Sequence, residues 1–121
     1  MTRHNPRLYL THILDSIALI ESYVSGIDLP GFVADQEKQD AVVRRLEIMG
    51  EAVKNLPTDI RAGSPQVPWT RIAGMRDKVV HDYMGVDVEL VWIVATTMLE
   101  QLRQEVQTIL DGLEGARGGT A

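Results

Sequence analysis

The amino-acid sequence predicts an all-α fold, an antiparallel bundle of four main helices. Apolar residues recur every three or four positions along four long segments, which is the spacing of a buried helix face. Glycine and proline lie between these segments, where they end helices. No segment shows the alternating pattern that indicates a strand. The 121 residues suffice for one domain, which we place at 1–112, followed by a flexible tail at 113–121.

Residues that seldom continue a helix mark the ends of the first two predicted helices. We expect the first helix to end near Gly26 and the second to run from about Asp35 to Leu56, where Pro57 stops it. The connection at 27–35 has room for about one helical turn. The apolar line of the first helix follows helical spacing and includes one charge: Leu10, Ile13, Leu14, Ile17, Ala18, Glu21 and Val24. The residues of the second helix expected to face inward are Ala41, Val42, Leu46, Met49, Ala52, Val53 and Leu56.

The third and fourth predicted helices follow a turn-rich link. The third spans roughly Trp69 to Tyr83, and Gly85 is a natural C-terminal cap because glycine readily adopts the left-handed conformation. Asp87 can cap the fourth helix, which is expected to continue to about Leu110. The glycine-rich end of the chain is typical of a frayed tail.

Composition restricts the class of protein. Apolar residues make up 45% and charged residues 24%, as in ordinary globular proteins. The net charge of −5 argues against a bulk basic nucleic-acid binder but permits a small phosphate site. The lack of cysteine excludes disulfides and thiolate metal sites. The stretch "LVWIVATTML" is too short to span a membrane and "MTRHNPRLYL" lacks a signal-peptide core, so we expect a cytoplasmic protein.

Arg76 falls at the centre of an apolar stripe on the third predicted helix. At about 100° per residue, the stripe consists of Trp69, Ile72, Ala73, Val79, Val80 and Tyr83. A buried guanidinium must be paired, since burying it alone is very costly. One interpretation is that Arg76 pairs with Glu47 or Glu51, or extends its head to water. Another is that the stripe is partly an interface with a second chain.

A polar line beside this stripe contains Asp77 and His81. The two are four residues apart, so on a helix the carboxylate reaches the imidazole and favours its charged form. The plainer interpretation is a histidine that balances the helix dipole. Arg76 and His81 are about 140° apart on a regular helix. They converge only if the helix end distorts or if a second chain completes the site, which favours a dimer.

The remaining candidate residues have plainer interpretations. His4 and His12 are interpreted as surface residues, because neither has a partner at metal-ligand spacing. Gly50 is expected to permit close approach of another helix, and the neighbouring Glu51 to be a solvated or ion-paired acid. We therefore predict no metal site.

Arg76, His81 and Tyr83 form an R-x4-H-x-Y motif, and with its flanking residues it resembles HEPN-domain toxins of the HepT type. The resemblance extends through "LEIMGEAVKNLP", "VPWTRIAGMRDKVVHDYMGVD" and "LVWIVA", in the family's order and spacing, and covers about Arg7 to Leu110. The motif embedded in W-x2-I-x-G-M-R-D-x3-H-x-Y-x-G-x-D is specific. Asp77 occupies a position where relatives often carry asparagine.

The resemblance implies a homodimeric HEPN-type bundle and a metal-independent endoribonuclease without a cofactor. Arg76 and His81 would be catalytic, with Asp77 supporting them, and two motifs facing each other in the dimer would form one cleft. The family members are toxins of toxin–antitoxin pairs, neutralised by a partner nucleotidyltransferase of the MntA type. That partner would transfer AMP to the Tyr83 hydroxyl, where the added anion would block RNA.

A second function class stays open from the sequence. A non-catalytic helical adaptor would use the same surface to dock a nucleotidyltransferase or to bind nucleotide without cleaving RNA. The acidic net charge favours this alternative. The presence of Arg76, His81 and Tyr83 together favours the ribonuclease.

Overall fold

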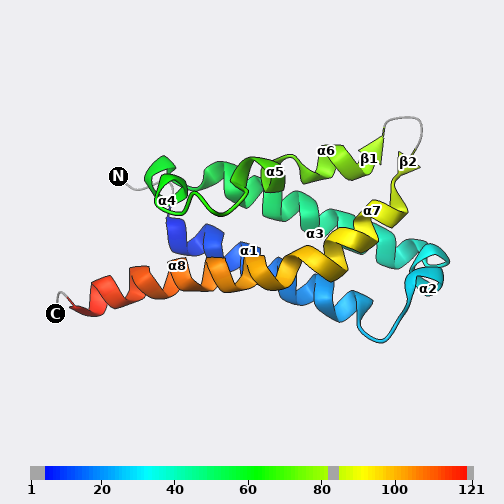
Figure 1. The fold of residues 1–121 in the computed structure, drawn as a ribbon, viewed down its shortest axis with the longest axis horizontal. Helices are drawn as coiled ribbons and strands as arrows, with labels where there is room; N and C mark the ends of the chain where they lie inside the picture. Colours follow the sequence, from blue (N-terminus) through cyan, green and yellow to red (C-terminus); the bar gives the residue numbers. More distant parts are fainter. Residues whose placement is uncertain (1–4, 82–84, 120–121) are drawn as a thin grey trace.

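The computed structural model describes residues 5–81 and 85–119 and forms an antiparallel helical bundle (Figure 1). Its elements in chain order are α1 (Pro6–Val24), α2 (Leu29–Val33), α3 (Gln36–Asn55), α4 (Thr58–Ala62), α5 (Trp69–Ala73), α6 (Met75–Val79), β1 (Val80–His81), β2 (Gly85–Val86), α7 (Val88–Ile93), the π-helical η1 (Val94–Met98) and α8 (Leu99–Gly119). Four lengthwise runs alternate in direction: α1, α3, the pair α5–α6, and the rod α7–η1–α8. The all-α prediction is therefore confirmed.

Side-chain caps begin the long helices at the expected positions. Asp35 accepts a hydrogen bond from the Lys38 amide at 3.1 Å and starts α3, and Asp87 accepts one from the Leu90 amide at 3.2 Å and starts α7. These contacts satisfy amide donors that have no partner inside the helix. The predicted starts of the second and fourth helices are confirmed.

The core lies where α1, α3 and the α7–η1–α8 rod meet. α1 packs against both α3 and α8, while α3 also packs against α5 and α6. Side chains that are at most 6% exposed fill this contact: Leu10, Ile13, Ile17, Ile20, Val42, Leu46, Met49, Val53, Val91, Val94, Leu99, Leu102 and Val106. The apolar spacing seen in the sequence thus forms one continuous core, except at Ala18, which is exposed.

The prediction of one continuous third helix is wrong. The helix is interrupted at Gly74, which has φ −97° and ψ 5°, and its second part ends at Val79 instead of Tyr83. Val80 then pairs with Val86 in a short antiparallel ladder, and the Asp87 amide donates to the Val79 carbonyl at 2.6 Å. The β-branched Val80, with φ −108° and ψ 119°, suits this extended backbone better than a helix.

The pairing of β1 with β2 corrects the expectation that the chain contains no strand. Gly85 does adopt a positive φ of 80°, but it lies in β2 opposite His81 and does not cap a helix. Tyr83, the predicted helix end, lies outside the described residues.

The last helix also differs from its prediction. It passes through a π-helical turn at η1, where the Thr96 and Thr97 hydroxyls donate to the Trp92 and Ile93 carbonyls at 2.7 and 2.5 Å. It continues to Gly119, so the predicted end near Leu110 is wrong. The domain division at residue 112 stays a prediction. Across residues 5–81 and 85–119, each helix is too short or too polar to cross a membrane.

Candidate active site

The break at Gly74 determines where Arg76 points. Because α6 restarts the helix after that break, Met75 and Val79 occupy the buried positions, with 6% and 0% exposure. Arg76 is displaced outward, and 49% of its side-chain surface is exposed. The predicted location of Arg76 in the apolar stripe is therefore wrong, because that stripe assumed an unbroken helix.

Arg76 is held by a carboxylate from α3. Its Nε donates to Glu47 Oε2 at 3.1 Å, which confirms the interpretation that Arg76 pairs with an acid of that helix. Its Nη1 also lies 3.6 Å from Asp77 Oδ1. Glu51, the other candidate partner, instead lies 3.5 Å from the ammonium of Lys54. The Arg76 side chain is therefore exposed to solvent, but its orientation is restrained by Glu47.

A groove of about 480 Å³ opens beside Arg76, between α1, α3 and α6. Its lining is mixed and polar: Tyr9, His12, Arg44, Glu47, Ile48, Gly50, Glu51, Ala52, Lys54, Asn55, Ala73, Arg76 and Asp77. Guanidinium and ammonium groups beside hydrogen-bonding side chains suit a phosphate-bearing ligand. The groove is therefore the candidate active site.

His12 lies in this groove, although the sequence indicated only a surface residue. Its ring meets that of Tyr9 edge to face, with the centroids 6.1 Å apart. The side chain is exposed, as expected, but it shares the groove with Arg76. No spacing in the sequence links α1 to α6, so this proximity arises only when both helices pack on α3.

The predicted contact between Asp77 and His81 loses its geometric basis. That contact required an unbroken helix through His81, whereas α6 ends at Val79 and His81 belongs to β1. The distortion of the helix end, one of the two conditions for bringing Arg76 and His81 together, is present. The side chain of His81 and all of Tyr83 lie outside the described parts of the chain.

Gly50 brings the short helices close to α3. A Cβ atom at Gly50 would lie 3.0 Å from the Ala73 carbonyl oxygen and 3.4 Å from that of Ile72. Such a distance forces a shift of backbone, so only glycine fits without movement. The predicted close approach at Gly50 is confirmed, and it lets α5, which directly precedes α6 and Arg76, lie close against α3.

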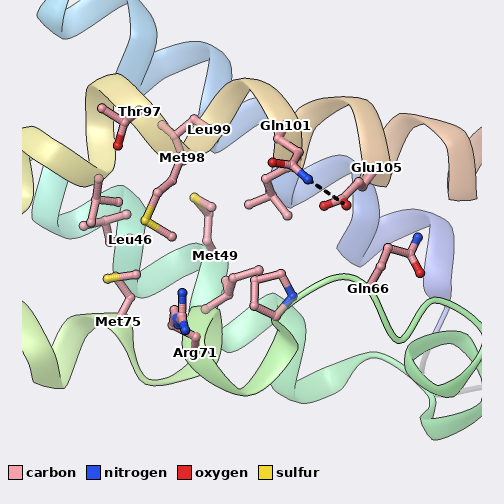
Figure 2. Close-up of a pocket in the computed structure, with 14 residues that line it drawn as sticks. Leu46, Met49, Gln66, Arg71, Met75, Thr97, Met98, Leu99, Gln101 and Glu105 are labelled. Atoms are coloured by element: carbon pink, nitrogen blue, oxygen red, sulfur yellow. Dashed lines mark hydrogen bonds between the residues drawn. The ribbon is translucent and has the colours of Figure 1, made fainter.

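A second hollow, of about 400 Å³, is lined by three methionines, and we call it the methionine-lined cavity (Figure 2). Met49, Met75 and Met98 project into it from α3, α6 and η1, with Leu46 beside them. Arg71 and Glu105 line it as well, and Gln101 Nε2 donates to Glu105 Oε2 at 3.5 Å. It contains no histidine among its lining residues, so it lacks a proton-transfer group suited to neutral pH.

The carboxylates and histidines of the described chain do not form a metal-binding cluster. Within residues 5–81 and 85–119, no three His, Asp or Glu side chains come close enough together to hold a metal ion. The acids of the groove are instead engaged with cations, as the Glu47 and Glu51 contacts show.

Comparison with known proteins identifies the family. The model of the family described as "Ribonuclease HepT-like" matches residues 13–109. The chain is 45% identical over 105 residues to "Putative RNase TTE0752" of Caldanaerobacter subterraneus subsp. tengcongensis, covering 87% of this chain and 94% of the relative. It is 46% identical over 84 residues to "Probable ribonuclease HepT" of Thermococcus cleftensis, covering 69% and 76% of the two chains.

A longer relative shares only part of its length with this chain. "Gamma-glutamylcyclotransferase and putative RNase MJ0434" of Methanocaldococcus jannaschii is 41% identical over 112 residues, which is 93% of this chain and 50% of the relative. No solved structure matches the chain. The family match and the relatives covered over most of their length mean that this chain is a ribonuclease of the HepT-like family, with a HEPN-type helical bundle.

Proposed function

We propose that this ribonuclease cleaves RNA internally and without a metal ion, using the 2′-hydroxyl of the RNA itself as the nucleophile. The observation that carries the proposal is Arg76, exposed in a polar groove and anchored through its Nε to Glu47. An anchored guanidinium suits a phosphate that gains negative charge during the reaction, because preorganised charge stabilises the transition state.

The reaction consists of one displacement at phosphorus. A base removes the 2′-hydroxyl proton, the 2′-oxygen bonds to the adjacent phosphorus, and the bond from phosphorus to the 5′-oxygen breaks. An acid gives a proton to that leaving oxygen. The products are a 2′,3′-cyclic phosphate and a 5′-hydroxyl. His81 is assigned to proton transfer, since imidazole titrates near neutral pH, and Arg76 to the phosphate oxygens.

Two proton-transfer groups are needed, and one chain carries one motif histidine. A homodimer whose motifs face each other supplies the second imidazole as His81 of the other copy. His12, which lines the groove of Arg76, is a second candidate for that role. Asp77, 3.6 Å from the Arg76 Nη1, supports the guanidinium in this scheme.

The same proposal includes a toxin–antitoxin role with covalent neutralisation. A partner nucleotidyltransferase of the MntA type would direct the Tyr83 hydroxyl oxygen to the α-phosphorus of ATP. The bond to the β-phosphate oxygen then breaks, pyrophosphate leaves, and the hydroxyl proton passes to solvent. Tyr83 follows His81 by two residues, so the added phosphodiester would place an anion beside the site and oppose RNA by charge and volume.

The alternative function is a non-catalytic adaptor that docks a nucleotidyltransferase or binds nucleotide. The charge balance of the groove favours it, since Arg44, Lys54 and Arg76 are opposed by Glu47, Glu51 and Asp77. A neutral groove attracts a long polyanion less strongly than a basic one does.

Cleavage in the presence of a chelator tests the main proposal. Purified protein incubated with single-stranded or loop RNA and EDTA is expected to yield 2′,3′-cyclic phosphate and 5′-hydroxyl ends, identified by mass spectrometry of the fragments. His12→Gln distinguishes the two candidates for the second imidazole. Cleavage should be lost if His12 supplies that group and kept if His81 of the other copy supplies it. Cleavage that disappears with EDTA and returns with magnesium contradicts the metal-independent mechanism.

The mass of co-expressed protein tests the neutralisation. With its nucleotidyltransferase, the wild type is expected to gain roughly 329 Da or multiples of it, the increment of adenylate groups joined through phosphodiesters. Tyr83→Phe removes only the acceptor oxygen, so it is expected to gain no mass and to stay active on RNA beside the partner. A wild type without the increment, together with a neutralised Tyr83→Phe, would favour the adaptor.

A further inference from the structure

The carboxylate of Glu47 lies between two arginines of the groove. Its Oε2 accepts from Arg76 Nε at 3.1 Å, and its Oε1 lies 3.5 Å from Arg44 Nη1. Each oxygen of the Glu47 carboxylate therefore contacts one guanidinium. Glu47 is also the least exposed member of the trio, at 34% of its side-chain surface against 49% for Arg76 and 71% for Arg44.

Glu47 belongs to a more constrained element than the arginine it holds. It lies within the 20-residue α3, between the buried Leu46 and the tightly packed Gly50. Arg76 extends from α6, which has five residues. A long arginine side chain on a short helix has many rotamers, and fixing one of them costs conformational entropy before any ligand binds. An ion pair to a rigid helix fixes the rotamer in advance.

The pairing leaves part of the Arg76 guanidinium available. Glu47 takes the Nε position, while the terminal Nη groups carry the remaining four donors. Asp77 approaches Nη1 only to 3.6 Å, beyond hydrogen-bond length, and its side chain is 83% exposed. An incoming phosphate therefore competes with the loosely placed Asp77 and not with Glu47.

We propose that Glu47 is a positioning residue for RNA cleavage, an inference that rests on the proposed function. It holds Arg76 by Nε so that the Nη groups face the groove at a fixed orientation toward the scissile phosphate. Arg44, on the other oxygen, restrains the Glu47 carboxylate. The reaction then begins with the guanidinium already placed, which matters because small displacements of a stabilising group lower the rate steeply.

The opposite effects of charge and position make this role testable. A carboxylate in a phosphate-binding groove opposes RNA by charge, so removing it should by itself strengthen RNA binding. A positioning role predicts instead that its removal lowers kcat. Glu51 is a matched control, because it lies one turn further along α3, lines the same groove and pairs with Lys54 rather than Arg76.

The experiment measures kcat and KM on one RNA in EDTA for wild type, Glu47→Ala, Glu47→Gln and Glu51→Ala. We expect Glu47→Ala to lower kcat by about tenfold or more, with KM unchanged or lower. Glu47→Gln keeps an oxygen that accepts from Arg76 Nε, so it should retain most of kcat. Glu51→Ala removes the same charge from the same groove, so it should change KM in the same direction as Glu47→Ala while lowering kcat much less. Thermal melting confirms that each variant is folded.

Two results overturn the inference in distinguishable ways. If the wild type cleaves RNA and a folded Glu47→Ala has the same kcat, only the positioning role is refuted. Wild type that cleaves no RNA refutes the proposed function and the inference with it. If Glu47→Ala does not fold, Glu47→Asp carries the test. It keeps the charge but draws the oxygens back by one methylene, so a wild-type kcat in that variant refutes the role.

Discussion

The polar groove and the methionine-lined cavity are similar in size, about 480 and 400 Å³, and α3 lines both. Glu47, Gly50 and Glu51 belong to the groove, while Leu46 and Met49 belong to the cavity. The difference follows from helical spacing, because residues one position apart on a helix point about 100° apart. One helix thus supplies an anchoring carboxylate to one hollow and apolar surface to the other.

The two hollows also differ in how an arginine is used. Arg76 in the groove donates to a carboxylate on another helix at 3.1 Å. Arg71 lines the cavity, and in the described part of the chain it has no ion-pair partner. Exposed cations are common on protein surfaces, whereas a cation fixed by a partner on a rigid helix is prepared for a specific ligand. Anchoring by a carboxylate, more than the presence of an arginine, therefore distinguishes the groove from the cavity.

The largest expected effect concerns these two arginines. Arg76→Ala should lower the rate of RNA cleavage by about 100-fold or more, since it removes preorganised charge at the phosphate. Arg71→Ala should leave the rate close to wild type. Both rates are measured on the same RNA in EDTA, with thermal melting as the folding control. Equal losses in the two variants would remove the distinction between the hollows.

A smaller effect is expected from the cavity wall. Met49 is 2% exposed, and Met49→Ala should lower the free energy of unfolding by about 2–4 kcal/mol, because it deletes buried apolar contacts and enlarges the cavity. Denaturant titration measures the change. The rate per folded molecule should stay near wild type, because Met49 lies outside the groove lining. A large loss of cleavage by fully folded protein would mean that the cavity takes part in the reaction.

The smallest expected stability effect links the two regions. Gly50→Ala places a Cβ atom 3.0 Å from the Ala73 carbonyl oxygen, so α5 must shift away from α3. We expect about 1–3 kcal/mol of destabilisation, as for other overpacked positions. The shift also moves Arg76 relative to Glu47, so cleavage by the folded fraction should fall. Gly112→Ala is the control, because nothing lies within 4 Å of a Cβ atom there. An unchanged melting temperature in Gly50→Ala would contradict the tight contact.

The long helices and their caps could be predicted because the responsible interactions are local. Asp35 and Asp87 cap nearby amides, and the apolar spacing of α1, α3 and α8 continues over several turns. The break at Gly74 could not be predicted from periodicity. An unbroken helix buries Arg76, whereas the broken one buries Met75, and the choice depends on packing against α3. Tertiary packing overrides a local helical preference in this segment.

The sequence by itself determined the helical class, the starts of the second and fourth predicted helices and the R-x4-H-x-Y motif, since each depends on residues close together in the chain. Only the tertiary structure decided which residues share the groove. Glu47, His12 and Arg76 come from three elements, and they meet because α1 and α6 both pack on α3. Contacts between distant segments depend on relative helix placement, which is fixed by side-chain packing and by the glycine contact at Gly50.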